Sequence, residues 1–150
     1  PVGWWVDVGN GENFGQVLIG NASANRLLGT FNEESGICFG LPQPTDQRPE
    51  LLLPPPVPQP QVHGEPVEPT CAEAVGAGEQ SPTINQAMAA MTLEVVRRIV
   101  EGTCTWMQLS LDLEQGFMRP TLATPEMVSQ ITGMPVEKLI RRTATPAERR

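Results

Sequence analysis

Cys71 is the residue of this sequence best placed for covalent chemistry. It lies in "EPTCAEAV", directly before a stretch that can form a helical turn. A thiol at a helix N-terminus faces free N–H groups and the positive end of the helix dipole, which lower its pKa and activate it as a nucleophile. The alternative is that Cys71 packs as an ordinary small apolar side chain.

Two further residues carry groups that could act in catalysis. Asp7 follows the apolar run "VGWWV", where a strand is expected to emerge into a turn, and functional carboxylates are common in such positions. Capping of that turn by its own side chain is the competing interpretation. His63 is the single histidine and lies among prolines, so we interpret it as a loop residue rather than as the base of a Ser–His or Cys–His pair.

The glycines of "GNGENFG", residues 9–15, invite comparison with a phosphate-binding loop. Such a loop requires a helix directly after the glycines, because the helix N-terminus holds the phosphates. Here the loop runs into Gln16-Val17-Leu18-Ile19, which is typical of a strand. The stretch therefore predicts a hairpin with an Asn/Gly-rich turn.

Charge and composition exclude several classes of protein. The chain of 150 residues has a formal net charge of −7, which argues against a general nucleic-acid surface. Its basic residues crowd the end: Lys138, Arg141, Arg142, Arg149 and Arg150. This basic tail is either a solvated terminus or a contact for phosphate or an acidic partner.

The three cysteines form no C-x-x-C pair, so we predict no zinc site. An odd number of cysteines is also a poor basis for a disulfide framework, so we predict a reducing, cytoplasmic location. No apolar run approaches the length of a membrane span. Because the chain begins with Pro1 directly before a strand, we expect that its true start is missing.

Hydrophobic periodicity and turn residues predict the elements that must position these groups. Residues 42–69 hold most of the prolines and are expected to be an extended insert or linker, without helix or interior strand. Residues 81–102 predict one long amphipathic helix. Residues 106–119 predict a second hairpin that Pro120 ends, and residues 124–142 predict two short helices.

The predicted architecture is α/β, with two strand pairs around one long amphipathic helix and a proline-rich insert. We expect residues 1–120 to form the main unit and residues 121–150 a short helical basic tail. Residues 4–8 are nearly all apolar, as in a strand that is covered on both faces. A complete, self-contained core with this segment at an edge or in a coil would overturn the interpretation of these residues as the back portion of a larger sheet.

Three pieces of the sequence resemble a known family. These pieces are "WWVDVGNGENFGQVLIG", "EPTCAEAVGAGEQSPTINQAMAAMTLEVVRRIVEG" and "WMQLSLDLEQGFMRP". Their order and spacing are similar to those of the C-terminal half of ThiF-type E1-like proteins, particularly the ThiF-like member of the bacterial PRTRC system. The resemblance covers most of residues 3–120, and it implies that the chain is the C-terminal part of a Rossmann-like sheet.

The resemblance implies an ATP- and Mg²⁺-dependent adenylyltransferase that activates the C-terminal carboxylate of a ubiquitin-like or sulfur-carrier protein. It also implies a homodimer, and a thioester on Cys71 as the candidate acyl acceptor. The ATP loop, the phosphate-binding arginine and the magnesium-binding aspartate of the family have no counterpart here, and the zinc-binding cysteine pairs of many relatives are missing. The fragment alone is therefore expected to be inactive.

A non-catalytic role remains open. An E1-like domain can act as a binding or scaffold module, with the proline-rich segment and the basic tail engaging partners.

Overall fold

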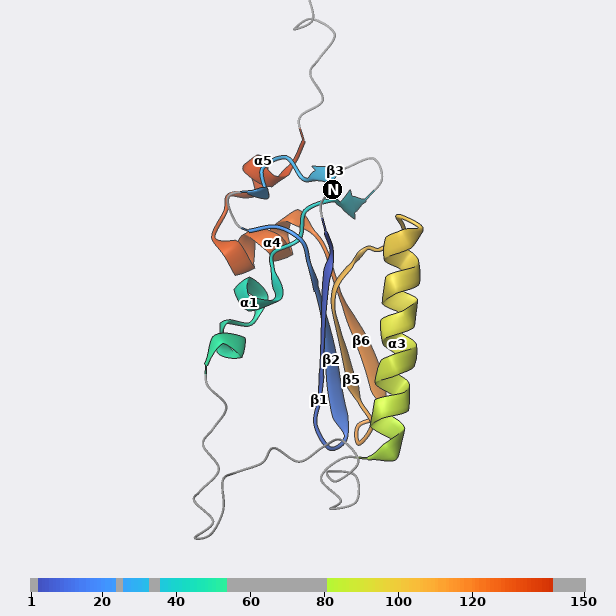
Figure 1. Cartoon of the computed structure of the whole chain (residues 1–150). Helices are drawn as coiled ribbons and strands as arrows, with labels where there is room; N and C mark the ends of the chain where they lie inside the picture. Colours follow the sequence, from blue (N-terminus) through green and yellow to red (C-terminus); the bar gives the residue numbers. More distant parts are fainter. Residues whose placement is uncertain (1–2, 24–25, 33–35, 54–80, 142–150) are drawn as a thin grey trace, which may run out of the picture.

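The computed structural model describes residues 3–23, 26–32, 36–53 and 81–141 (Figure 1). This part of the chain is mixed α/β, with a four-stranded antiparallel sheet and a few helices, as the coarse prediction expected. Its elements are β1 (Trp5–Asn10), β2 (Phe14–Gly20), β3 (Phe31–Asn32), β4 (Ile37–Cys38), α1 (Pro44–Gln47), the 3₁₀ turn η2 (Pro49–Leu52), α3 (Pro82–Val100), β5 (Trp106–Asp112), β6 (Phe117–Leu122), α4 (Pro125–Thr132) and α5 (Val136–Leu139).

Both predicted hairpins are confirmed, and they join into one sheet. Strands β1 and β2 pair antiparallel, and the glycine-rich stretch closes the turn between them, where the N–H of Gly11 donates to the carbonyl of Phe14 over 2.9 Å. Strands β5 and β6 form the second hairpin, with Gly116 at a φ of 68° in its turn. Because β2 also pairs with β5, the strand order is β1-β2-β5-β6.

The prediction that Pro120 ends the returning strand is wrong, because β6 continues to Leu122. Strand β6 is the last strand of the four, so one side of its backbone has no strand partner in the described part of the chain. Proline is tolerated on such an edge because its missing N–H is not needed there.

The prediction that residues 4–8 form a strand covered on both faces is wrong for this chain. Strand β1 lies at the other edge of the sheet, and Trp5 and Val8 are 63% and 42% exposed. The doubly covered strand is β2, where Val17 and Leu18 point to opposite faces and are both buried. Strand β2 is internal because it has paired neighbours on both sides.

The long helix is confirmed, and it contacts β1 and β2. In Figure 1 it lies along one side of the sheet. Ser81 caps its start by accepting a hydrogen bond from the N–H of Thr83 over 3.2 Å, and Pro82 occupies the first turn. Ile84, Met88 and Val95 are buried on one stripe. Ala89 and Ala90 are exposed.

The proline-rich region is only partly as predicted. Residues 44–52 form α1 and η2 rather than an extended chain. Pro44 and Pro49 each start a short helical turn, a position where the missing N–H costs nothing and the fixed φ favours the helix. Residues 54–69 of the predicted insert lie outside the described part of the chain.

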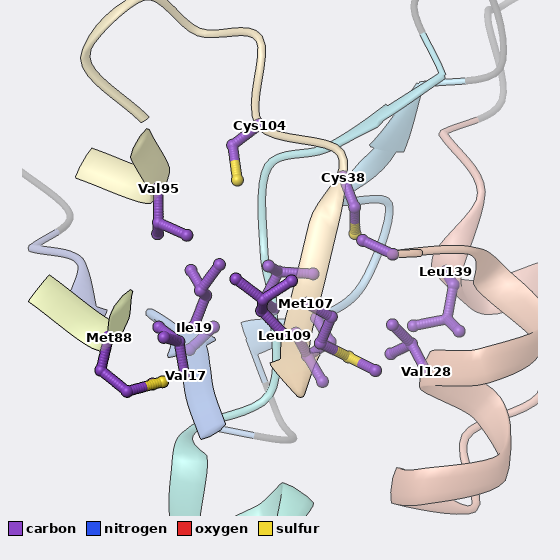
Figure 2. Close-up of a cluster of buried hydrophobic side chains, with 14 of the residues drawn as sticks. Val17, Ile19, Cys38, Met88, Val95, Cys104, Met107, Leu109, Val128 and Leu139 are labelled. Carbon is purple, nitrogen blue, oxygen red and sulfur yellow. The ribbon is translucent and has the colours of Figure 1, made fainter. Parts of the chain in front are cut away.

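The two C-terminal helices belong to the same buried cluster as the sheet. Thr124 caps α4 by accepting from the N–H of Met127 over 3.2 Å, and Gly133 ends it at a φ of 70°. Figure 2 shows Val128 of α4 and Met107 of β5 facing one another. The register of β5 against β6 shifts by one residue between Trp106 and Gln108, so Met107 has no paired residue on β6.

Candidate functional site

The residue predicted to capture an acyl group, Cys71, lies outside the described residues, as do His63 and the tail beyond Arg141. The other two cysteines are buried. The thiol of Cys38 donates to the carbonyl of Gly40 over 3.0 Å, and that of Cys104 to the carbonyl of Trp106 over 3.6 Å. Burial raises the pKa of both thiols, so neither is poised as a thiolate nucleophile.

Asp7 lies in the middle of β1 rather than at the turn where it was expected. The register places it beside Leu18 of β2, on the face of the sheet that α3 does not cover. There it lines a groove of about 270 Å³. The groove is lined by Trp5, Asp7, Gln43, Pro44, Thr45 and Leu51. Trp5 and Asp7 of β1 thus line the groove together with residues at the start of α1 and with Leu51 of η2.

A buried glutamine holds α1 against the sheet and so forms the wall of this groove. The Nε2 atom of Gln47 donates to the carbonyl of Ile19 over 2.8 Å and to that of Pro42 over 2.7 Å. The side chain is 8% exposed. Because a buried carbonyl without a donor costs about 1–3 kcal/mol, this single amide satisfies two otherwise expensive groups.

A glycine makes the close approach possible. A Cβ atom on Gly20 would lie 2.2 Å from the carbonyl oxygen of Pro42 and 2.8 Å from the Cα of Gln43. Both neighbours are backbone atoms that cannot rotate away. Only glycine at this position lets residues 42–44 cross the end of β2.

The groove has the chemistry of a binding site rather than of a catalytic centre. Asp7 supplies a half-buried carboxylate, Trp5 an exposed indole face, and Leu51 an apolar wall. Carboxylate and indole together favour a cationic or amide-bearing group that can stack and donate hydrogen bonds. No three His, Cys, Asp or Glu side chains gather as metal ligands anywhere in the described residues.

A second hollow, of about 330 Å³, brings the start of the basic tail to the β3–β4 hairpin. Arg141 lines it together with Phe31 and Phe39, and the N–H of Arg141 donates to the carbonyl of Phe31 over 3.0 Å. Its guanidinium suits a carboxylate or phosphate. The hollow therefore fits the predicted contact of the basic tail with an acidic partner, and that contact stays a prediction.

The groove residues on α1 and η2 escaped the sequence prediction because the prolines were taken to exclude helical turns. One signal could have revealed them. "PTDQ" places proline at the first helical position and an acidic residue in the first turn, which is a helix-start pattern.

Comparisons with protein-family models, with curated proteins and with solved structures found no match to this chain. Within the described ranges, every helix is too short or too polar to span a bilayer.

Proposed function

We propose that this chain is the C-terminal portion of a ThiF-type E1-like adenylyltransferase, which uses ATP and Mg²⁺ to activate the C-terminal carboxylate of a ubiquitin-like or sulfur-carrier protein in the cytoplasm. The nucleotide site belongs to a neighbouring half of the protein. In this proposal the sheet is the continuation of a Rossmann-like sheet.

One observation carries the proposal: the uncovered side of β1. Trp5 and Val8 are 63% and 42% exposed on a strand that has a backbone partner on one side only within the described residues, and Trp4, directly before that strand, is 38% exposed. The three side chains of this β1 edge surface (Trp4, Trp5 and Val8) are apolar, and β1 carries no lysine or proline, only the charge of Asp7. Free edges of soluble proteins are commonly protected by such residues or by a covering element.

The edge position bears on the proposal in two ways. A finished core with β1 at its margin would speak against a sheet that continues beyond it. The core here is continuous across the sheet and the helices, yet it leaves two tryptophans at the margin. In the proposed protein, a neighbouring strand and helix from the nucleotide-binding half would cover these two side chains and make β1 an internal strand.

The direct test is ATP–pyrophosphate exchange by the full-length protein with candidate carrier proteins. Exchange that depends on a carrier supports the adenylyltransferase, whereas carrier binding without exchange supports the scaffold alternative. Cys71→Ala then addresses the thioester. If adenylation survives and acyl transfer to the protein is lost, Cys71 is the acceptor, and if both survive, it is structural.

The edge can be tested separately from activity. Val8→Asp places a charge on a side chain that is already 42% exposed in this chain, so the isolated 150 residues should lose less than about 1 kcal/mol. In the full-length protein the same charge would be buried, and we expect a loss of about 3 kcal/mol or more. Leu122→Asp, on the opposite edge strand at 52% exposure, is the matched control and should cost the same in both. Equal effects of Val8→Asp in both proteins would contradict the covered edge.

A further inference from the structure

The hollow beside Arg141 is built from two segments that lie far apart in the sequence. The N–H of Gly29 donates to the carbonyl of Lys138 over 2.8 Å. The N–H of Arg141 donates in turn to the carbonyl of Phe31 over 3.0 Å. These backbone bonds fix the two segments against each other, so the hollow has a defined shape before any ligand binds.

Core packing fixes the position of the apolar walls. Leu27 and Cys38 are buried in the core. The residue that follows each of them lines the hollow, and Leu28 is 60% and Phe39 57% exposed there. Because the preceding residue is held in the core in both cases, these two large apolar side chains are presented to solvent at fixed places.

Arg141 is the charged residue among the described residues that line the hollow. Its side chain is exposed and makes no ion pair with another described residue. Arg97 and Arg98 of α3, by contrast, are both paired with glutamates. The guanidinium of Arg141 is therefore available to an anion, and its fork of N–H groups fits the two oxygens of a carboxylate.

We propose that this hollow binds a small monocarboxylic acid whose apolar body is about the size of a phenyl ring. The carboxylate pairs with Arg141, and the apolar body lies against Phe31 and Phe39. Pockets for small ligands are mostly apolar, with a few polar groups that fix the orientation, and they typically measure roughly 300–1,000 Å³. The hollow, at about 330 Å³, lies at the lower end of that range, so one ring and one carboxylate suit it better than a nucleotide.

Charge and hydrogen bonding favour a single carboxylate over a phosphate or an acidic polypeptide. The net charge of −7 repels a polyanion. Phosphate sites usually combine several N–H donors from successive backbone groups or from a helix N-terminus. Three backbone N–H groups of the lining, those of Gly29, Phe39 and Arg141, already donate to carbonyls. The inference does not depend on adenylation, and it is narrower than the contact predicted for the basic tail.

Saturation-transfer NMR of the full-length protein with hydrocinnamate, a propionate with a terminal phenyl ring, tests the ligand class. We expect saturable binding with a Kd on the order of 1 mM, as for a ligand of this size in an open pocket. Hydrocinnamide keeps the shape without the charge, and acetate keeps the charge without the ring. Each should bind at least about 10-fold more weakly.

Three outcomes of this titration would overturn the inference. The first is the absence of saturation up to about 20 mM, roughly 20 times the expected Kd. The second is binding of hydrocinnamide or of acetate as tight as that of hydrocinnamate. The third concerns acetyl-glycyl-phenylalanine, which presents the same ring and carboxylate at the end of a polypeptide. If this probe binds more tightly than hydrocinnamate, the assignment to a small acid is wrong.

Two substitutions locate the site. Arg141→Gln should weaken the binding of hydrocinnamate at least about 10-fold and leave the Tm unchanged, because the side chain is exposed and the backbone N–H is retained. Lys138→Gln is the matched control, since it removes the same charge from an exposed side chain that does not line the hollow. It should change the Kd by less than about twofold. An equal loss in both variants would mean that the acid responds to the overall charge, and no loss in Arg141→Gln would mean that it binds elsewhere. Either result overturns the site.

Discussion

Gly20→Ala tests how the groove beside Asp7 is built. The added Cβ atom would lie 2.2 Å from the carbonyl oxygen of Pro42, whereas ordinary van der Waals contact begins at 3.4 Å. Residues 42–44 must therefore move by about 1.2 Å, the difference between these two distances. The same segment carries the carbonyl to which Gln47 donates over 2.7 Å.

The cost of this movement has two parts. Overpacking against backbone atoms costs about 1–3 kcal/mol. Loss of one of the two hydrogen bonds of Gln47 leaves a buried carbonyl without a donor and adds about 1 kcal/mol or more. We expect Gly20→Ala to lower the free energy of unfolding by about 2–4 kcal/mol in total, and the Tm by about 8–15 °C.

Urea unfolding followed by tryptophan fluorescence measures this change, since Trp5 lines the groove. Gly9→Ala is the matched control on the neighbouring strand, because a Cβ at Gly9 meets no atom within 4 Å. It should change stability by less than about 0.5 kcal/mol. If both variants unfold at the same urea concentration, the close approach of residues 42–44 to β2 is not what fixes α1 on the sheet.

Three further predictions concern the caps, charges and thiols. Hydrogen bonds from Arg97 and then from Arg98 lower the pKa of Glu94 to about 2, so this carboxylate contributes stability that is present above about pH 4.5 and lost as the pH falls toward 2. Glu94→Gln should therefore flatten the acid side of a curve of Tm against pH over that range. Glu114→Gln, at an exposed position, is the control and should leave the curve unchanged. Thr124→Ala removes the cap of α4 and should cost about 1 kcal/mol in urea unfolding, whereas Thr124→Ser should retain most of it, and equal losses would contradict the capping role. Burial raises the pKa of the Cys38 and Cys104 thiols, so peptide mapping after iodoacetamide treatment at pH 7 should find both unmodified until the protein is unfolded.

The elements that follow from local chemistry were predictable from the sequence. Ser81 and Pro82 mark the start of α3, Thr124 and Pro125 the start of α4, and glycines occupy the tight turns. Each of these signals acts within a few residues, so no knowledge of the tertiary structure was needed to interpret it.

The order of strands in space was not predictable in the same way. Both β1 and β2 contain runs of apolar residues, and composition alone favoured β1 as the strand covered on both faces. Which strand is internal depends on pairing with β5, about ninety residues further along the chain, and no local pattern encodes that pairing. The groove was missed for a related reason. Its walls come from β1, α1 and η2, and only the close approach at Gly20 brings them together.

Exposed apolar side chains lie on two adjoining elements, β1 and α3. The side chain of Asn10 at the end of β1 hydrogen-bonds that of Asn85 at the start of α3 over 2.9 Å, so the edge strand and the helix run side by side. Ala89, Leu93, Val96 and Val100 are not needed for the core, since α3 already buries Ile84, Met88 and Val95. If the β1 edge surface binds a nucleotide-binding half, Val8→Asp should abolish that contact, and Leu93→Glu, on the exposed side of α3, should leave it intact. Loss of the contact in both variants would mean that the partner covers the exposed side of α3 as well as the β1 edge surface.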